Sequence, residues 1–349
     1  MYIPAKTLDD LMQRVLGKLV KSGGRNRASR GRTREIRSVL LKVTNPRARL
    51  SHTEKKGKIF SALGELLWYL AKSNDLEFIS YYLDQYRKES EDGETVYGAY
   101  GPRLYGLRGN NQVEHVLELL TRNPGSRRAV IQLFDADDIR ERHQEIPCTC
   151  TLQFMVRDGQ VELATTMRSN DAFKGLPHDV FSFTMIQEIV ARILGLEPGA
   201  YTHFVGSLHL YNDAENDNDD VPAARQYLAE GWQPTQFVEM PAMPPGDPRP
   251  SIETVVRAEA AIREGRALDD SVGALPPYWR DIVRLLEIFG HIKRGERDAI
   301  PRIRRAMADP VYIEYISRRE RPRRTVPRSA QPSLPFVEVQ AEEGGEEDR

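Results

Sequence analysis

The sequence has few cysteines, no long apolar run and no excess of charge of one sign. Its two cysteines, Cys148 and Cys150, are too close in sequence to bridge distant elements well, so we expect a reduced, cytoplasmic protein. No stretch of about 18 apolar residues is present and the N-terminus lacks a signal-peptide core, so we expect no membrane association. Lys and Arg number 50 against 51 for Asp and Glu, which gives no reason to expect a nucleic-acid partner.

Several cofactor motifs are missing as well. The chain contains no GxGxxG, no P-loop and no pair of CxxC motifs with zinc spacing. These absences argue against a dinucleotide, a nucleoside triphosphate or a structural zinc ion, and we expect no bound metal. With 349 residues, of which 40% are hydrophobic, the chain can nevertheless bury a substantial core.

Apolar periodicity predicts helices and strands that are mixed along the chain. Helical spacing covers residues 7–21, 59–71, 76–86, 112–120 and 179–194. Strand-like runs cover residues 36–43, 129–134, 150–156, 161–167 and 201–211. Residues 23–35, rich in Gly and Arg, are predicted to form a loop that is either simply solvated or a mobile anion-binding segment. Residues 94–106, rich in Gly, Tyr and Pro, are also predicted to form a loop.

Composition divides the chain into four parts. Residues 1–238 are predicted to form the main domain, and residues 239–250 a proline-rich connector. Helical patterns return over residues 251–318, which we interpret as a helical C-terminal extension. Residues 319–349 carry a basic run and an acidic end and are predicted to be disordered. The basic run has the composition of a nucleic-acid contact, but we favour a solvated tail.

The stretch Glu145–Ser182 concentrates the side chains that can carry chemistry. It contains the thiol of Cys148, a turn at residues 157–160 and the sequence RSND, with Asp179 shortly after. Thiol, guanidinium, hydroxyl and carboxyl groups thus gather where strands end, which is where proteins usually hold substrates. We therefore expect the active site here.

Three other features leave alternatives open. Glu65 stands alone in an apolar helix and either turns to solvent at the helix edge or handles protons or water. His209 and Tyr211 share one face of a strand, as core or edge residues or as part of a site. Arg127 and Arg128 point to opposite sides of a strand start, so either one is a surface charge or the pair reaches a neighbouring subunit.

Taken in order, the segments GELLWYL, VYG, SRR, IPC, RSNDAFKGLPHD and HLY resemble the thymidylate synthase superfamily over roughly residues 30 to 215. Within it the sequence is most similar to the cytidylate (CMP or dCMP) 5-hydroxymethylases. The resemblance implies an α+β fold, in which helices flank a large mixed β-sheet, with a C-terminal helical appendage added here. It also implies an obligate homodimer and 5,10-methylenetetrahydrofolate as cosubstrate.

The resemblance further implies roles for individual residues. Cys148 matches the nucleophile, Glu65 the glutamate that organises water, and Asp171 the aspartate that contacts the folate, whereas Cys150 matches no role and is expected to pack. The implied nucleotide contacts are Arg30 (with Arg32 equally defensible), Arg127 and Arg128 donated across the dimer, Arg168, Ser169, His209 and Tyr211. A guanidinium close to the thiol is expected to lower its pKa.

Departures from the synthase pattern point to the specific reaction. Asp179 replaces an asparagine that reads the uracil edge; a carboxyl group accepts from N4 of cytosine and pairs with N3 through one shared proton. Leu83 and Tyr86 stand where synthases carry two tryptophans, one of which shields the methylene intermediate from water. Ala172 replaces a larger residue, which we interpret as room for a ribose 2′-hydroxyl.

These departures predict transfer of a hydroxymethyl group to C5 of CMP, or of dCMP. The alternative within the same family is methylation of dUMP. A different class of function, an inactive homologue that binds RNA through its arginine-rich segments, is disfavoured because the thiol and the phosphate-binding residues are retained.

Overall fold

The computed structural model describes residues 1–28, 30–51, 58–231 and 238–320, and within them a mixed sheet is the central element. The order of its main strands is β1-β3-β7-β6-β5-β4, with β2 beside β3 and β8 beside β7. Pairs β1–β3 and β6–β7 are parallel, and the other pairs are antiparallel. The strands are β1 (Tyr2–Ala5), β2 (Gly24–Ala28), β3 (Gly31–Val43), β4 (Val130–Gln132), β5 (Thr149–Arg157), β6 (Gln160–Asp171), β7 (Glu197–Asp213) and β8 (Asn218–Asp219).

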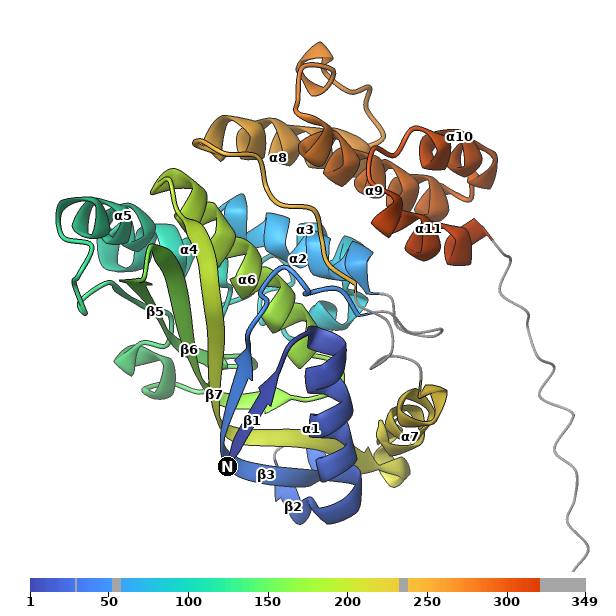
Figure 1. Ribbon diagram of the computed structural model, residues 1–349. Helices are drawn as coiled ribbons and strands as arrows, with labels where there is room; N and C mark the ends of the chain where they lie inside the picture. The colour runs from blue at the N-terminus through green and yellow to red at the C-terminus, as the bar shows by residue number, and fades with distance from the viewer. Residues whose placement is uncertain (29, 52–57, 232–237, 321–349) are drawn as a thin grey trace, which may run out of the picture.

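Helices cover the sheet and extend beyond it (Figure 1). Their bounds are α1 (Leu8–Ser22), α2 (Ile59–Leu70), α3 (Leu76–Tyr82), α4 (Tyr100–Gly106), α5 (Gln112–Arg122), α6 (Leu176–Ile193), α7 (Val221–Glu230), α8 (Arg249–Arg263), α9 (Pro277–Arg294), α10 (Ile300–Arg305) and α11 (Ile313–Glu320). The expected α+β architecture of a large mixed sheet with flanking helices is therefore confirmed.

The two helices against the sheet follow from their sequences. Helix α1 begins where the Thr7 hydroxyl accepts from the backbone N–H of Asp10, and its apolar residues at helical spacing are buried against the sheet. Helix α6 is apolar on most of its circumference and lies between the sheet and α2. Because α6 starts directly after β6, its first turn brings Asp179 to the end of the central strands, which positions the site.

The C-terminal helices α8–α11 gather on the far side of α2 and α3 (Figure 1). Phe289 of α9 stacks on Tyr82 of α3 at 5.0 Å, and the Tyr82 hydroxyl donates to Glu259 of α8 at 3.0 Å. The proline-rich stretch before α8 packs into the core through Met240 and Met243, which are both buried. The extension therefore supports the helices behind the site.

Two loop predictions were wrong. Residues 24–28 and 31–35 pair with each other as parts of β2 and β3, even though the side chains of β2 are all exposed. Within residues 94–106, Tyr100–Gly106 is helix α4. Helix α11 extends through Glu320, slightly into the predicted tail, while residues 321–349 lie outside the described residues.

Candidate active site

A cavity of about 840 Å³ opens where β6 and β7 end beside the first turn of α6. Most of the predicted site residues line it: Arg30, Glu65, Cys148, Arg168, Ser169, Asp171, Asp179, His209 and Tyr211. They come from segments far apart in sequence, including the β2–β3 turn, α2, the approach to β5 and the ends of β6 and β7. The predicted residues Arg127, Arg128 and Ala172 are not part of its wall.

Arg168 holds the segment that carries Cys148. Its guanidinium donates to the carbonyl oxygens of Pro147 at 2.9 Å and Ile146 at 3.0 Å, and its backbone N–H donates to the carbonyl of Cys148 at 2.9 Å. Three bonds therefore fix the thiol relative to β6. Because these hydrogen bonds to the segment before Cys148 already orient the guanidinium, a bound anion would find it held in a fixed position.

The Arg168 guanidinium lowers the pKa of the Cys148 thiol as expected, but burial has the larger effect. Burial raises the pKa of Cys148 to about 12, and the Arg168 guanidinium opposes this rise without overcoming it. The carboxyl group of Glu145 adds to the rise, and burial raises the pKa of Glu145 itself to about 7. At neutral pH the thiol is therefore protonated in the folded chain.

Glu65 is buried in the cavity wall and does not turn to solvent. The hydroxyls of Tyr69 and Tyr86 each donate to its Oε1 at 2.9 Å. Burial raises its pKa, while these two hydrogen bonds lower it in part. Its carboxyl group is thus held in one orientation at the cavity, as handling a proton or a water molecule requires.

Asp179 lies in the first turn of α6, where the helix dipole favours a negative charge. Burial nevertheless dominates and raises its pKa to about 8, with a further rise from Glu65. The side-chain amide of Asn170 donates to its Oδ2 at 2.7 Å. At neutral pH the carboxyl group is therefore mostly protonated, and it can both donate and accept.

Arg30 and Arg32, the two candidate phosphate-binding arginines, differ in position. Arg30 lines the cavity and forms a two-pronged ion pair with Glu89, while it also donates to the carbonyl of Gln144 at 3.3 Å. Arg32 is absent from the cavity wall and pairs with the exposed Glu215 at 2.9 Å. Arg30 is therefore the arginine of this hairpin that can meet a ligand.

Ser169, His209 and Tyr211 lie together at the cavity, where β6 runs beside β7. The Ser169 hydroxyl is 3.4 Å from Nδ1 of His209, and the rings of His209 and Tyr211 meet edge to face at 5.2 Å. Asp171 also faces the cavity, but its Oδ1 accepts from the backbone N–H groups of Phe173 and Lys174 and so shapes the turn into α6. These groups suit a ligand that carries hydroxyls.

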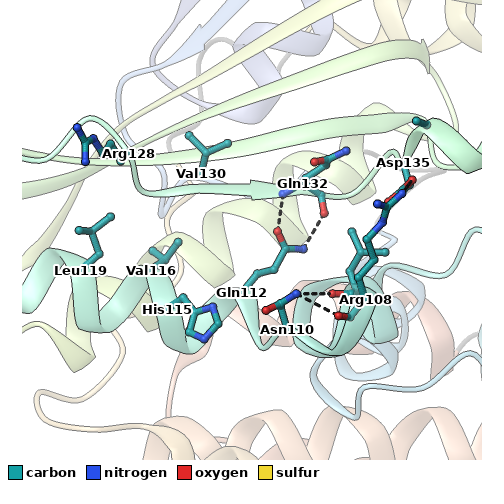
Figure 2. Close-up of a pocket in the computed structure, with 12 residues that line it drawn as sticks. Arg108, Asn110, Gln112, His115, Val116, Leu119, Arg128, Val130, Gln132 and Asp135 are labelled. Carbon is teal, nitrogen blue, oxygen red and sulfur yellow. Dashed lines mark hydrogen bonds and ion pairs between the residues drawn. The ribbon is translucent and has the colours of Figure 1, made fainter.

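Arg127 and Arg128 are exposed at the start of β4, away from the cavity. Arg128 borders a separate surface pocket between α5 and β4, which Gln112 and Gln132 close by paired hydrogen bonds of 2.7 and 2.9 Å (Figure 2). Within one chain, therefore, the two arginines do not reach the predicted site. A role there requires a second subunit.

The interpretation of Ala172 needs correction. Its side chain is fully buried and its backbone N–H donates to the carbonyl of His209 at 2.8 Å. Because it does not reach the cavity surface, its small size opens no room for a sugar hydroxyl. By contrast, Leu83 and Tyr86 both line the cavity, as their correspondence with the two tryptophans implied.

Sequence reasoning missed several residues of the cavity. Glu145 is partly buried beside Gly98, where a Cβ atom would lie 2.0 Å from the carboxyl oxygen, so a larger residue at position 98 would displace this carboxyl group. Asn170, to which the sequence assigned no role, contacts Asp179. The one available signal for Glu145 was its place three residues before Cys148.

The described residues hold neither a cluster of metal-binding side chains nor a membrane-spanning helix. No group of three or more His, Cys, Asp or Glu side chains there is arranged to hold a metal ion. No helix in the same part of the chain is long and apolar enough to cross a membrane.

Known proteins are similar to this chain over about half of its length. The sequence profile of the thymidylate synthase family matches residues 6–221. A deoxyuridylate hydroxymethyltransferase of Pseudomonas phage M6 is 32% identical over 166 residues, which cover 47% of this chain and 47% of that protein. A thymidylate synthase of Bacillus licheniformis is 34% identical over 186 residues, which cover 50% of this chain and 64% of that protein. The chain thus spans about half to two thirds of the length of these relatives.

Proposed function

The chain belongs to the thymidylate synthase family, and from this we propose that it transfers a hydroxymethyl group to C5 of a cytosine nucleotide, CMP or dCMP. The one-carbon donor is 5,10-methylenetetrahydrofolate, and water supplies the hydroxyl. A preference for CMP over dCMP rests on Ala172 leaving room for the ribose 2′-hydroxyl, and the burial of Ala172 removes this argument. Both sugars therefore enter the proposal equally.

The observation that carries the proposal is the carboxyl group of Asp179 in the cavity. With a pKa of about 8 it is mostly protonated at neutral pH. A neutral carboxyl group can donate its proton to N3 of cytosine from one oxygen and accept from the N4 amine with the other. A site that satisfies one base edge leaves buried groups unpaired with the other base, and this discriminates strongly.

The cavity residues suit addition chemistry at the pyrimidine ring. The sulfur of Cys148 adds to C6, and the electron density that leaves the C5–C6 bond is stabilised by the proton shared between Asp179 and N3. C5 then attacks the methylene carbon of the folate and loses its proton, and the bond between that carbon and the folate nitrogen breaks, which releases tetrahydrofolate and leaves an exocyclic methylene. After water has added to the exocyclic carbon, expulsion of the thiolate restores the ring. Arg30, Arg168 and Ser169 are assigned to the phosphate.

The cavity is also large enough for the cosubstrate. Its volume of about 840 Å³ lies near the upper end of the range for single-ligand sites, which leaves room for a folate beside a nucleotide. Asp171 faces this space and is assigned to the folate. Leu83 and Tyr86 replace the tryptophan shield, and Tyr86 brings a hydroxyl bonded to Glu65. This more polar wall favours water over hydride as the group that adds last.

A homodimer is part of the proposal. Leu40 of β3 and Phe204 of β7 are paired neighbours on the sheet, each 37% exposed, and Val130 of β4 is 42% exposed. Exposed apolar side chains on an open sheet face are typical of an interface. Arg127 and Arg128 lie next to Val130, so a partner covering this face would receive them at its own cavity.

Two assays test the proposal. Protein supplied with methylenetetrahydrofolate should release tritium from C5-tritiated CMP or dCMP, whereas release from dUMP alone would refute the cytosine assignment. Mass spectrometry should then find the hydroxymethyl nucleotide, with tetrahydrofolate as coproduct. Formation of dihydrofolate and a methylated product would favour the synthase reaction instead. Hydroxymethylation of dUMP would match the activity named for the phage relative.

A further inference from the structure

A line of buried polar side chains ends on Asp179. The Tyr201 hydroxyl lies 2.6 Å from Nδ1 of His203, Nε2 of His203 lies 3.2 Å from Oδ1 of Asn170, and Nδ2 of Asn170 lies 2.7 Å from Oδ2 of Asp179. Tyr201 and His203 are completely buried on β7 and do not line the cavity. Only the last two members, Asn170 and Asp179, reach the cavity.

The direction of the hydrogen bonds along this line is set from its far end. Burial lowers the pKa of His203 to about 3, so its ring is neutral and holds a single N–H. The Tyr201 hydroxyl can donate to Nδ1 only if the ring proton is on Nε2. Nε2–H then donates to the oxygen of the Asn170 amide, which turns the amide N–H groups toward Asp179. The structure has Asn170 in this orientation, with Nδ2 donating to Asp179 and Oδ1 facing Nε2 of His203, while the Thr165 hydroxyl also lies near that of Tyr201.

We propose that Tyr201 and His203 are positioning residues for base selection, which act by holding the Asn170 amide so that Oδ2 of Asp179 remains an acceptor. The proton of the neutral carboxyl group is then confined to Oδ1. This inference rests on the proposed role of Asp179 in reading the base. It adds residues that lie outside the cavity and belong to no motif of the sequence.

A fixed proton matters because a free carboxylic acid is ambiguous. If the proton can sit on either oxygen, the oxygen facing N3 of the base can be a donor and the other an acceptor, or the reverse. The first arrangement matches the edge of cytosine and the second that of uracil, so neither base is preferred. With the proton on Oδ1, a base whose N3 faces Oδ1 and whose position 4 faces Oδ2 is accepted only as cytosine. Uracil in the same place would set its N3–H donor against the O–H donor at Oδ1, and its O4 acceptor against the acceptor Oδ2, so neither hydrogen bond would form.

Nucleotide affinities measure this effect directly. Calorimetric titration of the full chain gives the ratio of the UMP to the CMP dissociation constant, with the deoxy pair as a second set. Tyr201→Phe keeps the buried volume and removes only the donated proton, and it should lower the ratio about fivefold, the effect of one hydrogen bond. His203→Phe removes both bonds and should lower it about tenfold or more. His203→Gln should restore it, since Gln also donates to Asn170 and accepts from Tyr201.

The outcomes separate the possible roles. If Tyr201→Phe and His203→Phe weaken CMP and UMP binding by the same factor and leave the ratio unchanged, the residues are merely structural and the inference is wrong. Equal affinity of the wild-type protein for both bases would also overturn it. Absence of tritium release from cytosine nucleotides counts against the proposed function alone, because the affinity ratio is measured without turnover. Thermal unfolding of each variant confirms that it is folded.

Discussion

Replacing Asp179 by asparagine should make the folded protein more stable at neutral and alkaline pH, although the residue belongs to the active site. The two side chains have the same shape, and the amide of Asn170 can donate to the new side-chain oxygen as it does to Oδ2. What changes is titration. The aspartate has a pKa of about 8 in the folded protein and about 3.9 when unfolded, whereas asparagine has none.

The sign follows from the proton count. Between pH 4 and pH 8 the folded wild-type protein holds a proton that the unfolded chain has released, so its stability falls as pH rises through this window. At 1.36 kcal/mol per pKa unit, the loss at pH 7 is about 4 kcal/mol. Because the carboxyl group borders a solvent-filled cavity, screening reduces this to about 2 kcal/mol. At pH 4 the loss is close to zero.

Urea unfolding of both proteins at several pH values between 4.5 and 8 measures the effect. The free energy of unfolding of Asp179→Asn minus that of the wild type should grow with pH. Asp138→Asn is the control: Asp138 is more deeply buried than Asp179 and is bonded through both oxygens to Arg103 at 2.7 and 2.9 Å. Its replacement should therefore lower stability by about 3 kcal/mol. Parallel pH curves for Asp179→Asn and the wild type would show that the carboxyl group is not held neutral.

Three further predictions concern activity. Asp179→Asn should reduce kcat/KM for cytosine nucleotides by about a hundredfold or more, since an amide cannot share its proton with N3, and the uracil nucleotides should change less; an unchanged ratio would remove the base-reading role. Arg30→Ala should raise KM for the nucleotide about tenfold, while Arg32→Ala, which removes an exposed pair, should change it less than twofold. Glu145→Gln should speed alkylation of Cys148 by iodoacetamide above pH 7, because it removes a negative charge that raises the thiol pKa; site-resolved mass spectrometry follows the rate, and a slower reaction would contradict this electrostatic account.

Local sequence patterns predicted the main elements well where burial gives a clear period. Helix α1 was expected at residues 7–21 and runs Leu8–Ser22, and β7 was expected at 201–211 and runs Glu197–Asp213. The failure at β2 has a clear cause. Residues 24–28 carry a loop-like composition and form β2 only because β3 supplies their hydrogen-bond partners. Because the side chains of such a strand are all exposed, its sequence shows no alternation of apolar and polar residues from which a strand could be predicted.

The sequence by itself determined the family and which side chains the site could use, since the Cys148 and RSND segments keep their order and spacing. Only the tertiary structure decided what those side chains do to one another. In the tertiary structure Arg30 lines the cavity whereas Arg32 does not, and Ala172 is buried away from the cavity. Burial also raises the pKa values of Cys148 and Asp179. These outcomes depend on burial and on contacts between residues that are distant in sequence, such as Asn170 and His203. Local sequence patterns show neither burial nor such contacts.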